Sequence, residues 1–256
     1  MIDLEVLPCT LDGGIAERAA IGLVVLATDQ TIEFEFHRLL GLPGVAIYEA
    51  RLFNDNDVTR ATLRAMGPRI APATALILPD IKLDVVAFGC TSASMELGEE
   101  AVFAEIRRVR PGVACTTPVT AARAALRALG VRRIGVLTPY SAEVNANVRA
   151  YLTAQDLDIA AFGTFNKQDD REAARISEAS IADGVAAMVA RASVDAVFVS
   201  CTSLRVVGMV EAIERRVGVP VTSSNHAMAW HSLRLAGVGD VVEGAGRLFR
   251  ISDLVV

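Results

Sequence analysis

Short apolar runs that end abruptly at small polar residues recur along this chain of 256 residues. Within each run apolar and β-branched residues follow one another without alternation, which is typical of parallel strands buried on both faces. Helical stretches separate the runs, so the elements alternate as in βαβ units and we expect parallel sheets of the α/β class. The predicted strands are 21–27, 84–88, 113–116, 134–137, 196–200 and 219–222.

Two helical stretches carry clear signals. Thr120 precedes an Ala- and Leu-rich segment, 121–129, as a candidate N-cap, and Gly130 follows it as the stop. In 177–191 the apolar residues at helical spacing share one face: Ile181, Val185, Met188 and Val189. We expect both helices to pack on the core rather than to hold a cofactor.

The second half of the chain repeats the first. Segments 84–92 and 195–203 both pass from an apolar run into the triplet Cys-Thr-Ser. The match continues on both sides, pairing 21–25 with 134–138 and 112–116 with 218–222. The chain is therefore expected to be a duplicated unit of about 110 residues, a size that suits one compact lobe.

The repeat predicts how the chain passes between its two lobes. Residues 118–130 and 224–237 follow equivalent strands and are the candidate crossings, and the final segment is expected to return to the first lobe. This gives a first lobe of residues 1–117 plus 222–256 and a second lobe of residues 118–221.

Composition and charge exclude several classes of protein. Hydrophobic residues make up 52% of the chain, enough for a large core, so disorder is not expected. The longest apolar runs fall far short of the roughly 20 residues that span a bilayer, and the first residues form no signal peptide. We expect no membrane association and a cytoplasmic location. The net charge of −5 includes no basic stripe, so no nucleic-acid partner is expected, and the apolar content favours a homo-oligomer.

The four cysteines divide into two kinds. None forms a Cys-x-x-Cys pair or lies near histidines at zinc-ligand spacing, so no metal site is predicted. Cys9 and Cys115 are expected to be small buried hydrophobes. Cys90 and Cys201 instead follow matched strands, at the sheet edge where α/β proteins bind ligands.

Cys90 and Cys201 need an environment that ionises them, because only a few per cent of an ordinary thiol is thiolate at pH 7. The Thr-Ser pairs that follow them suit helix caps, and a helix N-terminus lowers a thiol pKa and holds a carboxylate. Arg205 is expected to reinforce either effect. Across a cleft, one thiolate can deprotonate or add to a carbon while the other thiol delivers a proton, with no cofactor. The pairs are Thr91 with Ser92 and Thr202 with Ser203.

Other catalytic patterns are weak. The chain has no Gly-x-Ser-x-Gly elbow and no phosphate loop, and Gly244-Ala245-Gly246 lacks the preceding strand of a dinucleotide site. His226 and His231 are interpreted as structural. Hydrolase and nucleotide-binding functions are therefore not expected.

Four motifs together resemble the aspartate/glutamate racemase superfamily, in the branch that contains maleate cis-trans isomerases, arylmalonate decarboxylases and ectoine-utilisation proteins. The resemblance covers nearly the whole chain and implies two pseudo-symmetric Rossmann-like (flavodoxin-like) lobes with parallel sheets and a cleft between them. The motifs are Gly89-Cys90-Thr91-Ser92, Ser200-Cys201-Thr202-Ser203, Leu137-Thr138-Pro139-Tyr140 and Gly244-Ala245-Gly246-Arg247-Leu248.

The resemblance implies roles for individual residues. Cys90 would be the nucleophile or base of the first lobe and Cys201 the opposing proton donor, while Tyr140 and Asn166 would contact the substrate. Structural alternatives stay open, with Tyr140 closing a loop and Asn166 capping a turn. The decarboxylases keep only the second cysteine, so two cysteines favour an isomerase or racemase.

One position departs from the maleate isomerases. Within the segment 26–33 they carry an Asn where this chain has Asp29. An ionised Asp29 would repel a second substrate carboxylate and accept N–H donors, which favours a substrate with a positive or N–H-bearing group. The segment looks like the ectoine-utilisation branch. The alternative for Asp29 is a helix N-cap. Glutamate racemases are less similar, because a His stands where this chain has Ser203.

The leading hypothesis is a cofactor-independent two-cysteine isomerase or racemase that acts beside a carboxylate of a small substrate, either an ectoine-related compound or a maleate-like dicarboxylate. One alternative is an arylmalonate-type decarboxylase that depends on Cys201. The other is a bilobed binding protein without catalytic activity.

Overall fold

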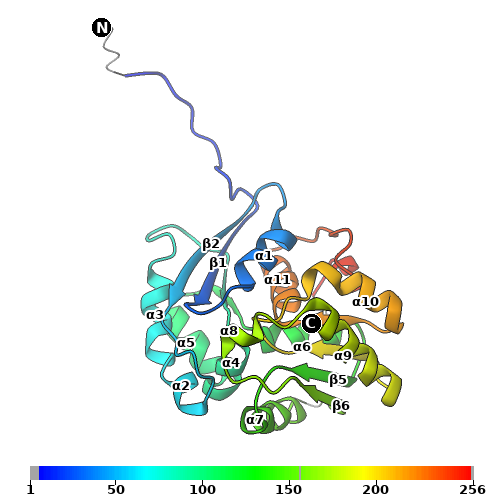
Figure 1. The fold of residues 1–256 in the computed structure, drawn as a ribbon. Helices are drawn as coiled ribbons and strands as arrows, with labels where there is room; N and C mark the ends of the chain where they lie inside the picture. Colours follow the sequence, from blue (N-terminus) through cyan, green and yellow to red (C-terminus); the bar gives the residue numbers. More distant parts are fainter. Residues whose placement is uncertain (1–5, 156, 255–256) are drawn as a thin grey trace.

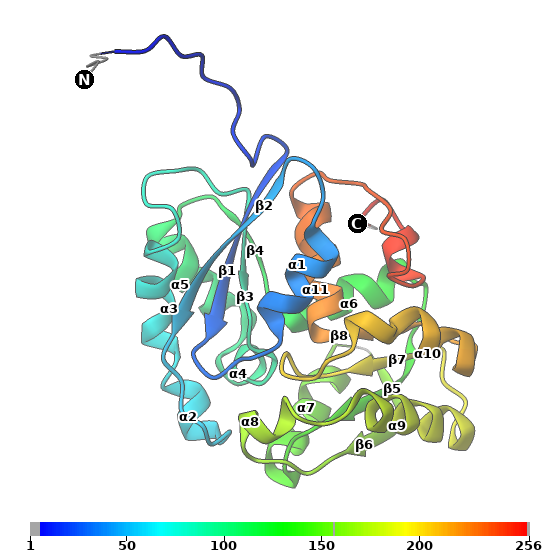
Figure 2. The same ribbon diagram turned by 45° about the horizontal axis from the view of Figure 1, so that its top comes forward.

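Two four-stranded parallel sheets form the framework of the chain (Figures 1 and 2). The computed structural model describes residues 6–155 and 157–254. The first sheet has the order β2-β1-β3-β4 and the second the equivalent order β6-β5-β7-β8, as the internal repeat requires. The α/β class and the parallel sheets are thereby confirmed. The strands are β1 (Ala19–Leu26), β2 (Val45–Leu52), β3 (Val85–Phe88), β4 (Ala114–Thr116), β5 (Arg133–Thr138), β6 (Asp158–Thr164), β7 (Ala196–Val199) and β8 (Val221–Ser223).

The six predicted strands are all present, with ends shifted by one or two residues. These strands could be predicted because their side chains are almost all buried, which requires a continuous apolar sequence. The strands β2 and β6 were not predicted. Each lies at the edge of its sheet, pairs with one neighbour and is half-exposed, so polar residues flank or follow its apolar run, at 45–48 in β2 and 159–162 in β6, within the strand.

Helices cover both sheets. The predicted helix at 177–191 is confirmed as α9, with Ser177 as its N-cap. The helix predicted at 121–129 begins earlier, at Pro118, because the Thr117 hydroxyl rather than that of Thr120 caps it. The helices are α1 (Ile32–Leu40), α2 (Arg60–Arg64), α3 (Gly67–Ala75), α4 (Thr91–Leu97), α5 (Glu99–Val109), α6 (Pro118–Ala128), α7 (Ala142–Thr153), α8 (Asp170–Ala173), α9 (Glu178–Arg191), α10 (Val210–Val217) and α11 (Ser224–Leu235), with 3-10 turns at Val207–Met209 and Leu248–Arg250.

The two central helices, α6 and α11, pack against each other where the chain passes between the sheets (Figure 2). They coincide with the predicted crossings at 118–130 and 224–237. The helix α11 follows β8 of the second sheet but packs on β3, β4 and α1 of the first. The strand β8 runs to Ser223, so a lobe boundary at 222 falls inside it, and the exact division of the chain stays a prediction.

The core is continuous between the two sheets. The larger apolar cluster includes Phe36 of α1, Phe198 of β7 and Trp230 of α11, all fully buried. The Trp230 indole N–H donates to the Ile251 carbonyl at 3.0 Å, which satisfies the polar end of that side chain. Within residues 6–155 and 157–254, no helix combines the length and the apolarity needed to cross a membrane.

Candidate active site

Cys90 stands at the end of β3, where it is itself the N-cap of α4. Its Sγ accepts a hydrogen bond from the Ala93 N–H at 3.4 Å and lies 3.8 Å from the Ser92 hydroxyl oxygen. The residue before Cys90, Gly89, lets the backbone pass close to β1 and α1, because a Cβ at that position would lie 2.8 Å from the Ile32 Cδ1 and 3.0 Å from the Val24 carbonyl oxygen. The predicted handover from strand to helix is confirmed here.

Cys201 follows β7 but enters a turn rather than a helix, so that half of the expectation is wrong. Its Sγ accepts from the Ser203 N–H at 3.4 Å, and the next α-helix, α10, begins only at Val210. Arg205 does not reinforce the thiol either. Its side chain is exposed and donates to the Ile176 carbonyl at 3.1 Å.

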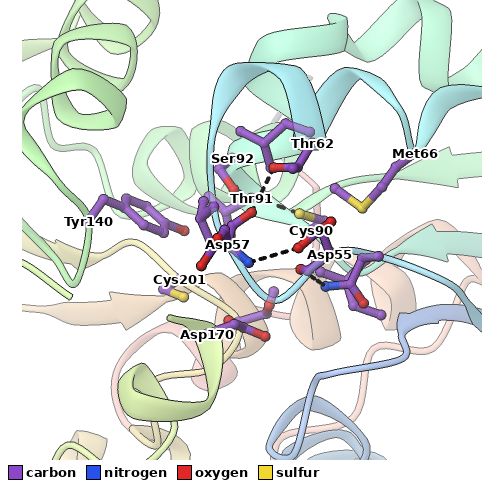
Figure 3. Close-up of a pocket in the computed structure, with 15 residues that line it drawn as sticks. Asp55, Asp57, Thr62, Met66, Cys90, Thr91, Ser92, Tyr140, Asp170 and Cys201 are labelled. Atoms are coloured by element: carbon purple, nitrogen blue, oxygen red, sulfur yellow. Dashed lines mark hydrogen bonds between the residues drawn. The ribbon is translucent and has the colours of Figure 1, made fainter. Parts of the chain in front are cut away.

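Both thiols line one small pocket between the lobes (Figure 3). Cys90 reaches it from the first sheet and Cys201 from the second, while Tyr140, which follows β5, points toward Cys201. The cavity measures about 20 Å³, room for one water-sized probe. Its lining also includes Leu26, Asn54, Asp55, Asp57, Val58, Thr62, Leu63, Met66, Thr91, Ser92, Asp170 and Thr202.

The pocket raises the thiol pKa values instead of lowering them. Burial, to which the charge of Asp170 adds, raises the pKa of Cys90 and of Cys201 to about 12, although hydrogen bonds to each sulfur act in the opposite direction. Burial and the neighbouring Cys201 also raise the pKa of Tyr140 well above its usual value. The expected helix-terminal activation is therefore wrong for the closed pocket, because desolvation outweighs the local donors.

Asp170 is a pocket residue that the sequence did not reveal. It begins the short helix α8 and is only 7% exposed. Its Oδ1 accepts from the Ser203 hydroxyl at 2.5 Å and its Oδ2 from the Thr28 hydroxyl at 2.7 Å. No strand or repeated motif marks position 170. The only signal was the pair of carboxylates Asp169 and Asp170, which reads equally well as a solvated helix start.

Asp29 lies behind the pocket rather than in its lining. Its Oδ1 accepts from the N–H groups of Thr31 and Ile32 at 2.7 and 2.8 Å, so it binds N–H groups at the start of α1, but the N-cap residue is Thr31 and not Asp29, as the alternative from the sequence had it. Its Oδ2 is buried without a hydrogen-bond partner among the described residues. Burial raises the Asp29 pKa to about 6, and its charge in turn raises the pKa of both thiols.

The other candidate residues divide between the pocket and its surroundings. Thr91, Ser92 and Thr202 line the pocket, although the Thr91 hydroxyl donates to Ser224 at 2.8 Å. Ser203 is buried beside the pocket and holds Asp170. Asn166 is exposed and does not line the pocket. Its φ of 53° lies in the left-handed region that Asn tolerates, in the loop that follows β6.

Two loops close the mouth of the pocket, and we call them the lid segments: residues 53–58 of the first lobe and 165–170 of the second. An isolated antiparallel bridge joins Asp57 to Asp169. The Val58 N–H donates to the Gln168 carbonyl at 3.2 Å, and the Asp170 N–H donates to the Asn56 carbonyl at 3.4 Å. The enclosed space of about 20 Å³ is too small for a carboxylate substrate as it stands.

The remaining cysteines and histidines lie outside the site. Cys9 is exposed in the segment that extends away from the body, so its expected burial is wrong, whereas Cys115 is buried as expected (Figures 1 and 2). His226 and His231 are buried, which lowers the pKa of each to about 4 and agrees with structural roles. Across the described parts of the chain, no three His, Cys, Asp or Glu side chains gather as metal ligands would.

The comparisons with known proteins fit this geometry. The model of the arylmalonate decarboxylase family, Amdase, matches residues 42–249. The chain belongs to this family. It is 36% identical over 169 residues to the arylmalonate decarboxylase of Bordetella bronchiseptica, covering 64% of this chain and 70% of that protein.

The family also contains maleate isomerases, and one from Nocardia farcinica is 29% identical to this chain over 92% of its length and 97% of the relative. The solved Nocardia maleate cis-trans isomerase superposes with a TM-score of 0.83 at 27% identity, covering 91% and 98% of the two chains. Another structure of that isomerase, a Cys-to-Ser variant, holds a covalently bound succinylcysteine intermediate. Cysteine-based catalysis is thus a property of the family.

Proposed function

We propose that this chain is a cofactor-independent isomerase or racemase in which Cys90 and Cys201 act from opposite sides on a carbon next to a carboxylate. The observation that carries the proposal is the shared pocket: two buried thiols, at the ends of equivalent strands in the two sheets, line the same cavity. A single nucleophilic cysteine would need no such symmetry. The candidate substrates are an ectoine-related compound and a maleate-like dicarboxylate.

The pocket supplies neutral donors for the substrate carboxylate. The hydroxyls of Ser92, Tyr140 and Thr202 line it beside the thiols. A thiolate at Cys90 then removes the proton from the adjacent carbon, and the Cys201 thiol protonates the opposite face, which inverts that carbon. For a double bond, the thiolate adds to one carbon, the remaining single bond rotates, and elimination restores the thiolate and the double bond.

The closed pocket is a resting state for this chemistry. With a pKa of about 12, only about one Cys90 side chain in 10⁵ is a thiolate at pH 7. Burial is the main cause, so separation of the lid segments and entry of a polar substrate both reduce the obstacle. The mechanism therefore couples opening and substrate binding to ionisation of the base.

A decarboxylase is the second candidate function. One wall of the pocket is apolar, made by Leu26, Leu63 and Met66, and would suit a substrate with an apolar substituent. In that reaction CO₂ leaves a malonate-type substrate and one thiol protonates the resulting carbanion. It would need Cys201 as the proton donor but not Cys90.

Incubation of candidate carboxylates in heavy water tests the proposal. Wild-type protein should exchange the hydrogen next to the carboxylate or isomerise the double bond, and Cys90→Ser and Cys201→Ser should each lower the rate by at least about 100-fold. Cys115→Ser, which changes a buried thiol outside the pocket, is the matched control and should keep wild-type activity.

The alternatives give different results in the same assay. Release of CO₂ that depends on Cys201 but not on Cys90 would identify the decarboxylase. Ligand binding that survives alkylation of both pocket thiols, without any turnover, would identify a binding protein and refute the enzyme.

A further inference from the structure

The charge pattern of the pocket does not suit a dianion. Three carboxylates line it, those of Asp55, Asp57 and Asp170, and none of its lining residues among those described is Lys, Arg or His. Asp55 and Asp57 are exposed, whereas Asp170 is buried beside the two thiols. A substrate with two carboxylates would bring two negative charges close to the carboxylate of Asp170, which no cationic lining residue offsets.

Two hydrogen bonds hold the Asp170 carboxylate in place, but none of the ion pairs among the described residues includes it. Both of its hydrogen-bond donors are neutral hydroxyls, from Ser203 and Thr28. The guanidinium of the next residue, Arg171, pairs with Asp169 instead. A carboxylate offers about four acceptor positions, so two remain for a ligand. Buried charge without a cation is expensive in proteins, which points to a cationic partner that arrives with the ligand.

A cation bound to Asp170 would also make the two thiols easier to ionise. The charge of Asp170 is the largest influence on Cys201 after burial, and it raises the pKa of Cys90 as well. A cation bound to Asp170 offsets this field and favours the thiolate. Substrate binding would then contribute directly to ionisation of the base that attacks it.

We propose that Asp170 determines specificity by binding a cationic nitrogen, an ammonium or amidinium group, on the small carboxylate that reacts between Cys90 and Cys201. This inference rests on the two-cysteine function proposed above. It assigns the substrate to the zwitterionic carboxylates, such as amino acids and cyclic amidine carboxylates, and away from dicarboxylates. The hydroxyls of Ser92, Tyr140 and Thr202 then hold the carboxylate, and Asp170 the nitrogen.

The experiment compares two groups of probes with wild-type protein and Asp170→Asn. The zwitterions are L-alanine, L-proline and a tetrahydropyrimidine carboxylate, and the dianions are maleate and phenylmalonate. Readouts are deuterium incorporation or isomerisation and the shift in unfolding temperature. Asn keeps the shape and can still bond both hydroxyls, because its amide oxygen accepts from one of them and its amide N–H donates to the other, which then acts as the acceptor. Asp80→Asn, at an exposed position outside the pocket, is the matched control.

Wild-type protein should bind and exchange at least one zwitterion and reject the dianions. Asp170→Asn should lower the rate for that zwitterion by about 10- to 100-fold, the effect of losing a hydrogen bond to a charged group, and should improve binding of the dianions. The control should leave the ratio between the two groups unchanged.

The outcomes separate this inference from the proposed function. Turnover of dianions that needs both thiols, with zwitterions inert, overturns the role of Asp170 but keeps the two-cysteine enzyme. Zwitterion binding that Asp170→Asn abolishes, without any effect of Cys90→Ser or Cys201→Ser on the molecule's fate, keeps the role of Asp170 and refutes the enzyme. Absence of both binding and exchange of the zwitterions overturns the inference.

Discussion

Replacement of Glu35 by Gln should remove a large part of the pH dependence of stability. Glu35 lies on α1 of the first lobe and is only 2% exposed. Its Oε1 accepts from the N–H groups of Val206 and Val207 at 2.6 and 2.8 Å, and its Oε2 from the Asn225 amide at 2.7 Å. The same Asn225 amide donates to the Thr202 carbonyl at 2.7 Å. Glu35 thus anchors the turn that carries Cys201.

Burial raises the Glu35 pKa from 4.5 to about 7, although three donors favour the charged form. A carboxyl whose pKa is higher in the folded state stabilises the fold least when it is ionised. Stability therefore falls as the pH rises from about 4.5 to about 7 and then levels off. At roughly 1.4 kcal/mol for each pH unit of difference, the loss between pH 5 and pH 8 is about 2.5 kcal/mol.

The assay is urea unfolding of wild-type protein and Glu35→Gln at pH 5 and pH 8. Gln does not titrate, but its amide N–H group faces the Asn225 amide, which costs about 1–3 kcal/mol at both pH values. The free energy of unfolding of the variant, relative to wild type, should therefore rise by about 2.5 kcal/mol between pH 5 and pH 8. Asp29 titrates in both proteins, but its charge also raises the Glu35 pKa, so the difference between the two proteins includes this interaction.

Glu33→Gln, on the exposed side of the same helix, is the control and should change the pH dependence little, since Glu33 pairs with Arg51 at the surface. A difference between wild type and Glu35→Gln that is the same at both pH values would refute the reasoning. So would a difference that moves in the opposite direction, because either result means that Glu35 does not carry a raised pKa in the folded protein.

Two further changes test how the site is built. Val58→Pro removes the N–H that donates to the Gln168 carbonyl and joins the two lid segments. Alkylation of the two pocket thiols should therefore become about 2- to 10-fold faster. An unchanged alkylation rate would mean that the lid segments do not control access to the thiols. Gly89→Ala forces a Cβ against the Val24 carbonyl oxygen. The free energy of unfolding in urea should fall by about 1–3 kcal/mol, and displacement of the neighbouring Cys90 should reduce activity. A variant as stable and active as wild type would contradict the close packing at Gly89.

The parts of the fold that could be predicted are those in which one physical demand controls the sequence. Interior strands buried on both faces must be apolar throughout, so β1, β3, β5 and β7 were legible, as were the cysteines at two of their ends. The edge strands β2 and β6 are half-exposed, meet no such demand and were missed, whereas the edge strands β4 and β8 are largely buried and were predicted.

The site was only partly predictable because its electrostatics depend on tertiary closure. Asp170 reaches the thiols because the lid segments meet, and no local pattern reports that contact. The same closure excludes water and raises the thiol pKa values, which reverses the expectation drawn from local helix caps. The expectation for Arg205 was wrong for a related reason: the turn after Cys201 leaves the Arg205 side chain at the surface, away from the thiol.

The duplicated Cys-Thr-Ser segments are alike in sequence and lie in unlike surroundings, yet the pKa of each thiol is raised to the same value of about 12. At Cys90, hydrogen bonds from Ala93 and Ser92 oppose the effect of burial. At Cys201, hydrogen bonds from Tyr140 and Ser203 do so, against the combined effects of burial and the charge of Asp170. Neither thiol is therefore the easier one to ionise in the closed pocket, so either can act as the base while the other donates its proton. Because the charge of Asp170 raises both pKa values, a cationic substrate that offsets this charge would favour ionisation of whichever thiol acts as the base, and hence catalysis in both directions.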